Sequence, residues 1–218
     1  MENNNAESKP VEKRMIKQLN DYIRSNVLDF KKIPEERKTR LHEIAKYIYE
    51  KIRQDKTANL LFICTHNSRR SHMSQLWARV AAFHYQIPQI YCFSGGTEAT
   101  AFNPRAVTAL KKAGFQIDSE GVGSNPVYTV KYAEGVKPVK AFSKKFQDPF
   151  NPRKEFAAIM TCSDADEACP VVPGAETRFS IPYEDPGTAD GTPREEAIYD
   201  ERCNQIAEEM FYLFAQVK

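Results

Sequence analysis

The sequence predicts an α/β fold, built on a four-stranded parallel sheet that helices cover on both faces. From residue 58 onward, short apolar runs of strand length alternate with longer segments of helical period. The first run, residues 60–63, is continuously apolar, as in strands that are buried on both faces of a parallel sheet. Such alternation implies right-handed crossovers, which place the helices against the sheet.

Each element follows from its local pattern. Strands are expected at residues 60–63, 89–93, 156–160 and 178–181, and helices at about 71–85, 103–114 and 193–217. Asn103 suits the cap of the second helix and Pro104 its first helical position, while Gly114 suits its end.

Residues 125–147 do not fit this alternation and predict an inserted β-hairpin. Two strands, at residues 127–132 and 136–142, flank a turn that contains Gly135. Pro138 would confine the second strand to a sheet edge.

Residues 1–57 predict a helical extension, separate from a main domain at 58–218. The extension holds 14 Lys/Arg against 10 Asp/Glu, whereas the remainder is slightly acidic. Residues 1–10 are polar and expected to be disordered, and two helices should follow, the second starting at Pro34. We expect this helical pair to pack on the main domain or on a second subunit. Recruitment of a partner is the alternative.

Composition excludes several classes of protein. The 218 residues are 41% hydrophobic and 28% charged, and the mean hydropathy of −0.58 is ordinary for a soluble domain. The longest apolar run, residues 210–215, is too short to span a membrane, and a net charge of +2 disfavours nucleic-acid binding. Five cysteines without a recognisable secretion signal indicate a reducing compartment, and hence the cytoplasm. The oligomeric state is not predictable.

The segment after the first strand predicts an anion-binding loop. It runs Cys64-Thr65-His66-Asn67-Ser68-Arg69-Arg70-Ser71. Its place at the carboxyl end of a parallel strand, leading into a helix N-terminus, suits backbone N–H groups that bind a tetrahedral oxyanion.

Individual side chains in the loop have expected roles. Arg70 can bind the oxyanion in bidentate fashion, and the field of the loop favours Cys64 as a thiolate. Ser71 can donate to that thiolate, and Asn67 tolerates a left-handed turn. The alternative is a buried cysteine at a strand end beside a solvated arginine.

These residues resemble the low-molecular-weight protein tyrosine phosphatases and the related thioredoxin-coupled arsenate reductases. The resemblance covers residues 58–218 and is clearest at 60–71, 94–106 and 160–186. It implies a flavodoxin-like sheet, Cys64 as nucleophile and an oxyanion held by residues 65–71. The family usually has Gly where His66 stands, and often a second Cys at the position of Arg69.

Two further cysteines, Cys162 and Cys169, follow the third strand. By themselves they could be incidental or half of a zinc site, but further ligands at metal spacing are lacking nearby, so we expect no metal and no cofactor. The resemblance implies that Cys162 resolves the Cys64 adduct and that Cys169 then forms a disulfide with Cys162 for thioredoxin to reduce. If residues 163–168 are helical, the pair lies about 10.5 Å apart at a rise of ~1.5 Å per residue, so the helix must unwind to form the bond.

The family also places a general acid in an Asp-Pro loop. The chain has two such pairs, and Asp185-Pro186 matches the family position after the fourth strand, whereas Asp148 suits a turn. The following residues, 187–190, lack the aromatic pair that walls the tyrosine phosphatase pocket. Cys92 and Cys203 are expected to pack in the core.

Three functions are therefore compatible with the sequence. The first is arsenate reduction through Cys64 and the Cys162/Cys169 pair, with a thioredoxin-type reductant. The alternative is hydrolysis of phosphotyrosine or another phosphomonoester through a Cys64 phosphoenzyme. The third is a non-catalytic oxyanion or redox sensor.

Overall fold

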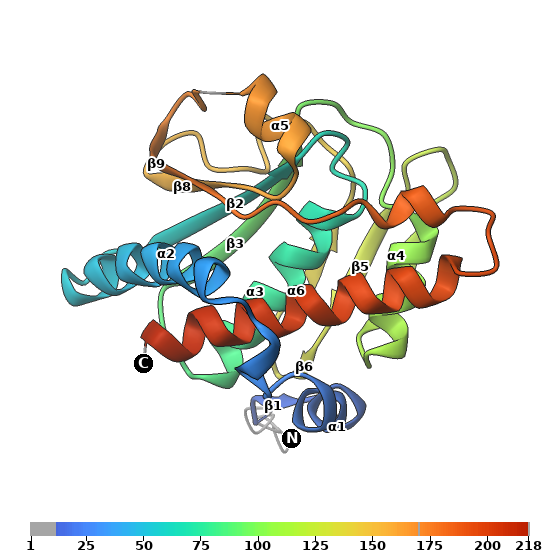
Figure 1. Cartoon of the computed structure of the whole chain (residues 1–218), viewed down its shortest axis with the longest axis horizontal. Helices are drawn as coiled ribbons and strands as arrows, with labels where there is room; N and C mark the ends of the chain where they lie inside the picture. The colour runs from blue at the N-terminus through green and yellow to red at the C-terminus, as the bar shows by residue number, and fades with distance from the viewer. Residues whose placement is uncertain (1–11, 170, 218) are drawn as a thin grey trace, which may run out of the picture.

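The computed structural model describes residues 12–169 and 171–217 (Figure 1). The disorder expected for residues 1–10 therefore lies outside the described part. Within that part, no helix combines the length and apolar character needed to cross a bilayer.

The strands and helices have the following bounds. The main sheet contains β2 (Ala58–Cys64), β3 (Ile90–Gly96), β8 (Phe156–Met160) and β9 (Ala175–Ser180). The other strands are β1 (Arg14–Met15), β4 (Gln116–Glu120), β5 (Val127–Lys131), β6 (Ala133–Glu134) and β7 (Val139–Ala141). The helices are α1 (Lys17–Asn26), α2 (Glu35–Arg53), α3 (Arg70–His84), α4 (Pro104–Lys112), α5 (Ser163–Ala168) and α6 (Glu195–Val217). Two 3-10 helices, Phe30–Lys32 and Pro186–Ala189, complete the set.

The main sheet has the order β3-β2-β8-β9, and its neighbouring strands all pair in parallel. The predicted four-stranded parallel sheet is thus confirmed. In its centre, Leu61 of β2 lies opposite Phe93 of β3 and Ala158 of β8. Because β2 and β8 are the two inner strands, their carboxyl ends meet at the middle of one sheet edge.

Helices cover the two faces unequally. Since side chains alternate along a strand, Leu60 and Phe62 face one side, where they join the large core beneath α2, α3 and α6. Leu61 and Ile63 face the other side and pack with Phe146 and with Ala165 of the short helix α5. In Figure 1, α2 and α6 lie side by side across the sheet, whereas α5 sits at the end of β8. The second face is therefore covered by one short helix and a loop.

The N-terminal helices pack on the body of the protein. Leu19 of α1 and Ile44 of α2 are fully buried in the same core as the sheet. Arg37 of α2 forms a largely buried ion pair with Glu209 of α6, with a distance of 2.8 Å between Nη2 and Oε2. Of the two arrangements expected for the helical pair, the structure shows packing on the main domain. A domain boundary at residue 57 stays a prediction.

The insertion is larger than the predicted hairpin. Strands β5 and β7 pair antiparallel, with β7 at an edge as predicted and Pro138 just before it, but β4 adds a third strand on the other side of β5. The sequence does not predict β4, because Ile117 is its one buried apolar residue and its apolar and polar residues therefore do not alternate. The short strand β6 follows β5 and pairs with β1, which joins the segment just before α1 to this insertion.

Candidate active site

The carboxyl edge of the sheet brings together the segments that carry the predicted chemistry. Strand β2 ends at Cys64 and α3 begins at Arg70, so the anion loop links the two. Strand β8 leads into Cys162, and the segment after β9 leads to Asp185. Residues 64, 70, 162 and 185 therefore meet at one edge, because the parallel strands that precede them end there.

Neighbouring segments bind the carbonyl oxygens of the anion loop from outside. The carbonyls of Cys64, Thr65 and Ser68 accept hydrogen bonds from backbone N–H groups of residues 97, 98 and 103, at 3.2, 2.8 and 2.9 Å. The carbonyl of His66 accepts from the Ser143 hydroxyl at 2.8 Å. In a planar trans peptide, each N–H points opposite to the preceding C=O. These bonds therefore turn the N–H groups of residues 65, 66, 67 and 69 towards the loop centre, where they can bind an anion.

Two residues allow the loop to close this tightly. Asn67 has φ +44°, the left-handed conformation expected for it. Gly96 lies directly behind the loop, where a Cβ atom would approach the nitrogen of Asn67 and the carbonyl oxygen of Thr65 to 2.6 Å each. A larger residue at position 96 would push the loop off β3.

Cys64 has the partner that the sequence predicts. Its side chain is buried, and its Sγ lies 3.1 Å from the hydroxyl oxygen of Ser71. The Asn67 side-chain amide donates to that same oxygen at 2.9 Å. Because the oxygen already accepts from Asn67, the Ser71 hydroxyl can donate its proton to the sulfur.

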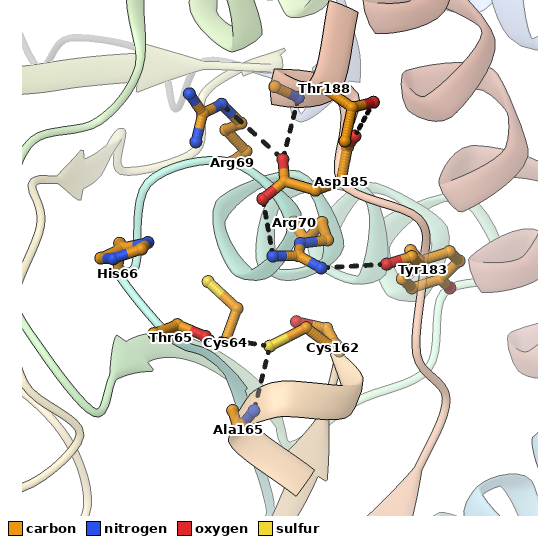
Figure 2. Close-up of polar contacts among 12 residues, drawn as sticks. Cys64, Thr65, His66, Arg69, Arg70, Cys162, Ala165, Tyr183, Asp185 and Thr188 are labelled. Atoms are coloured by element: carbon orange, nitrogen blue, oxygen red, sulfur yellow. Dashed lines mark hydrogen bonds and ion pairs between the residues drawn. The ribbon is translucent and has the colours of Figure 1, made fainter. Parts of the chain in front are cut away.

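Arg70 and Asp185 lie above Cys64 in Figure 2. Arg70 is 7% exposed; its Nη1 donates to the carbonyl oxygen of Tyr183 at 3.1 Å and its Nη2 to Asp185 Oδ2 at 2.8 Å. The second oxygen of Asp185 accepts from the N–H of Gly187 at 2.9 Å and so begins a 3-10 helix. The guanidinium and the carboxylate are thus held together over the loop.

Cys162 is adjacent to the anion loop. Its sulfur lies 3.5 Å from the hydroxyl oxygen of Thr65, the residue after Cys64, and Figure 2 shows both cysteines on the same side of Arg70. The Cys162 side chain is fully buried, caps the N-terminus of α5 and accepts from the N–H of Ala165 at 3.4 Å. Cys162, the first cysteine of the predicted Cys162/Cys169 pair, therefore lies within the candidate site.

Cys169 lies at the opposite end of α5 and is partly exposed. Six helical residues separate the two cysteines, so the condition for the 10.5 Å separation predicted from sequence is met. Arg178 of β9 stabilises that end of the helix: its Nε donates to the Cys169 carbonyl at 3.1 Å, and its Nη2 binds the carbonyl and carboxylate of Asp166. All five cysteines of the chain are free thiols.

The chain is similar to proteins of two related kinds. It is 27% identical over 157 residues to an arsenate reductase of Bacillus licheniformis, covering 72% of this chain and 94% of the relative. The arsenate reductase of Bacillus subtilis is 27% identical over 154 residues, with 68% and 92% covered. No protein-family model matches the chain.

Two solved structures share its architecture. A YwlE mutant from Bacillus subtilis gives a TM-score of 0.51 at 15% identity, covering 73% of this chain and 98% of the other. The low-molecular-weight protein tyrosine phosphatase from T. tengcongensis gives 0.50 at 17% identity, covering 73% and 99%. The fold is that of the low-molecular-weight protein tyrosine phosphatases. The predicted likeness to these phosphatases and to arsenate reductases is confirmed.

Arg69 departs from the usual loop of this phosphatase fold and points away from the loop centre. Its Nε donates to the Tyr199 hydroxyl at 2.6 Å and its Nη2 to Asp190 at 3.1 Å. A Cβ atom at Gly187 would lie 2.8 Å from the guanidinium carbon, so Arg69 packs flat against the Asp-Pro loop. The Arg69 side chain thus joins the anion loop to the loop that carries Asp185, and the part of Arg69 that faces an anion is its backbone N–H.

The structure also places the other residues that the sequence analysis discussed. His66 is about half exposed at the mouth, with its Nε2 3.6 Å from Glu98. Asp148 forms a turn in which its carboxylate accepts from the N–H of Phe150 at 2.9 Å, as expected. Cys92 and Cys203 are buried in the core, which confirms their predicted packing, and burial raises the pKa of each thiol to about 12.

Sequence reasoning missed four contributors: Ser143, Tyr183, Arg178 and Tyr199. Each acts through a backbone or side-chain bond to a site residue that is 9 to 130 positions away in the chain. No local motif marks them, because their role depends on which segments the sheet brings together.

Proposed function

We propose that this protein reduces arsenate to arsenite through a Cys64 thiolate and a Cys162/Cys169 dithiol, which a thioredoxin-type protein regenerates. The single observation that carries the proposal is the 3.5 Å distance from the Cys162 sulfur to Thr65, beside Cys64. A phosphatase needs no thiol there. The similarity to bacterial arsenate reductases supports the same reading.

The first step is nucleophilic attack on arsenic. Arsenate binds to the inward N–H groups of the loop, and its oxygens replace the Asp185 carboxylate as partners of Arg70. The Cys64 thiolate attacks the arsenic atom, and a hydroxyl group of arsenate leaves as water. Asp185 supplies the proton for that water, having taken one up from solvent when arsenate displaces its carboxylate from Arg70. Ser71 holds the thiolate in place by its hydroxyl.

The second step transfers two electrons. The Cys162 thiolate attacks Cys64 Sγ, the sulfur–arsenic bond breaks, and its electron pair stays on arsenic, which leaves as arsenite. A Cys64–Cys162 disulfide remains. Cys169 then attacks Cys162, which frees the Cys64 thiolate and leaves a Cys162–Cys169 disulfide for the external dithiol to reduce.

This relay requires α5 to unwind. A disulfide needs Cα atoms ~4.4–6.8 Å apart, less than the length of a six-residue helix. Cys162 is buried whereas Cys169 is partly exposed, so moving the oxidised pair outward presents it to a reductant. We place this chemistry in the cytoplasm, where thiols remain reduced.

Phosphomonoester hydrolysis is the alternative, because one observation favours it. Cys64, Arg70 and Asp185 suffice for a phosphoenzyme mechanism and already lie together. The Asp-Pro loop, however, continues into Gly187 against Arg69, where the phosphatases have an aromatic wall.

The test is a set of cysteine variants assayed with both substrates. Cys64→Ser should abolish arsenite production and aryl phosphate hydrolysis. Cys162→Ser and Cys169→Ser should each abolish thioredoxin-coupled turnover but leave aryl phosphate hydrolysis intact. Cys92→Ala, which alters a buried core cysteine, serves as the control and should retain both activities.

Mass mapping after a single arsenate pulse identifies the intermediates. The wild type should show a Cys162–Cys169 disulfide, and Cys169→Ser should trap a Cys64–Cys162 disulfide. If neither bridge forms and both serine variants turn over like the wild type, the relay is wrong and the phosphatase reading replaces it. Arg70→Lys should lose most activity in either case, because an ammonium cannot reproduce the planar two-point contact.

A further inference from the structure

A second pocket lies between the edge strand β3 and the inserted strand β7, and no residue of the anion loop lines it. Its volume is about 250 Å³, which suits a ligand smaller than a typical drug molecule. Side chains of α3, β3 and the segment from residue 137 to 151 form its walls.

The charged side chains that line this pocket are all positive. Arg79, Lys137, Lys140 and Lys144 line it, and no carboxylate does among the described residues. Of these four, only Lys140 is ion-paired in the described part of the chain, with Glu120.

Lys144 is buried, and within the described part of the chain it forms no ion pair. It is 6% exposed, and its Nζ donates to the carbonyl oxygen of Phe142 at 3.3 Å. Burial lowers the pKa of its ammonium group to about 8, while the charge of Asp148 acts in the opposite direction. A bound anion would relieve this desolvation.

Residues that line the pocket also carry buried polar atoms without partners among the described residues. Gln75 and Asn151 are each 5% exposed, and the Gln75 Oε1, Asn151 Oδ1 and Arg79 Nε atoms are buried without a hydrogen bond. The Gln75 amide nitrogen donates to the Cys92 carbonyl, and the Asn151 nitrogen to the carbonyls of residues 145 and 146. These bonds fix the amides so that their oxygens are the free atoms. The two amide oxygens have almost no accessible surface and lie within the wall, whereas the partly exposed guanidinium of Arg79 can pair with a bound anion.

We propose that this pocket binds a small organic anion, such as a sugar phosphate or a sugar acid. The acidic group is bound by Arg79 and Lys144, with Lys137 at the rim. The volume of about 250 Å³ accommodates the carbon chain of such a ligand as well as its acidic group.

The pocket is connected to the candidate active site through one residue. The backbone N–H of Lys144 donates to the Asn67 side chain at 3.0 Å, and its carbonyl accepts from the N–H of Gly96 at 2.9 Å. A ligand that holds the Lys144 side chain therefore also holds the segment that supports the anion loop.

The test is a nitrogen-resolved NMR titration of the full chain with ribose 5-phosphate, gluconate and uncharged ribose. The side-chain signals of Arg79 Nε–H and of the Gln75 and Asn151 amides locate binding in this pocket, distinct from the anion loop. We expect them to shift saturably with one or both anions and not with ribose. The comparison of phosphate with carboxylate shows which acidic group the pocket prefers.

Variants make the test quantitative. Arg79→Gln should weaken binding by about tenfold or more, as expected for loss of a charged hydrogen bond. Arg24→Gln, an exposed arginine of α1, is the charge-matched control and should leave the affinity unchanged. If Arg79→Gln does not fold, the exposed Lys137→Gln decides, and it should weaken binding in the same direction. Absence of saturable shifts with both anions, or an affinity that these pocket variants do not alter, overturns the proposal.

Discussion

Arg178 should control how readily Cys162 and Cys169 form a disulfide. The two cysteines cap opposite ends of α5, and the Arg178 guanidinium binds the C-terminal end at the Cys169 carbonyl and at Asp166. Arg178→Gln keeps a polar side chain of similar length but removes the charge and the two-nitrogen contact. The helix should then unwind more easily, because its own six residues are too short to be stable alone.

The contacts set the size of the effect. A hydrogen bond that involves a charged group contributes about 1.5–3 kcal/mol. The side chains of Arg178 and Asp166 are each about a quarter exposed, so solvent weakens their bonds. We therefore take about 1.4–2.8 kcal/mol for all the Arg178 bonds to α5 together. That range corresponds to an unwound population about 10–100 times larger. The reduced, helical state loses this stabilisation while the disulfide form does not. The reduction potential of the pair should therefore become about 30–60 mV more negative.

Two measurements check this prediction. The rate of Cys162–Cys169 closure is followed by alkylation and mass spectrometry at a fixed concentration of oxidised glutathione, and the potential by equilibration with a glutathione buffer. Arg194→Gln, which replaces an exposed arginine near the start of α6, is the control and should match the wild type. Equal closure rates and potentials in wild type and Arg178→Gln would refute the argument that α5 keeps the cysteines apart.

Three other expectations follow from the same structure. Asp185→Asn should slow aryl phosphate hydrolysis by about 10²–10⁴-fold, while Asp148→Asn has little effect; the opposite ranking would assign the acid to the other Asp-Pro loop. Arg69→Gln should lower the melting temperature in calorimetry by about 3–9 °C, for the loss of about 1–3 kcal/mol of bonds to the Asp-Pro loop, and an unchanged value would contradict those bonds. Burial lowers the pKa of His72 below 6.5, so below that pH the unfolded chain binds a proton that the folded chain does not. The free energy of unfolding should fall by about 1.4 kcal/mol per pH unit as pH drops from about 6.5 to 5, and a urea series should show a shallower fall in His72→Gln.

Local sequence patterns were sufficient to predict most strands and helices of the main domain. Strand β8 lies at the predicted residues, and α4 begins as predicted, with the Asn103 side chain accepting from the N–H of Arg105 at 2.9 Å. Gly114 ends that helix with φ +104°. Strand β9 begins three residues earlier than predicted, because it is an edge strand with half-buried side chains and so gives a weak apolar signal.

The sequence by itself determined the strand, loop and helix that place Cys64, Asn67, Arg70 and Ser71 together, because these residues are neighbours in the chain and their geometry follows from local spacing. Tertiary structure alone decided that Cys162 lies beside Thr65, since this contact joins residues 97 positions apart. Such contacts depend on the order of the strands in the sheet and on how the helices and the insertion pack against it. Neither the period nor the spacing of residues along one segment encodes that order.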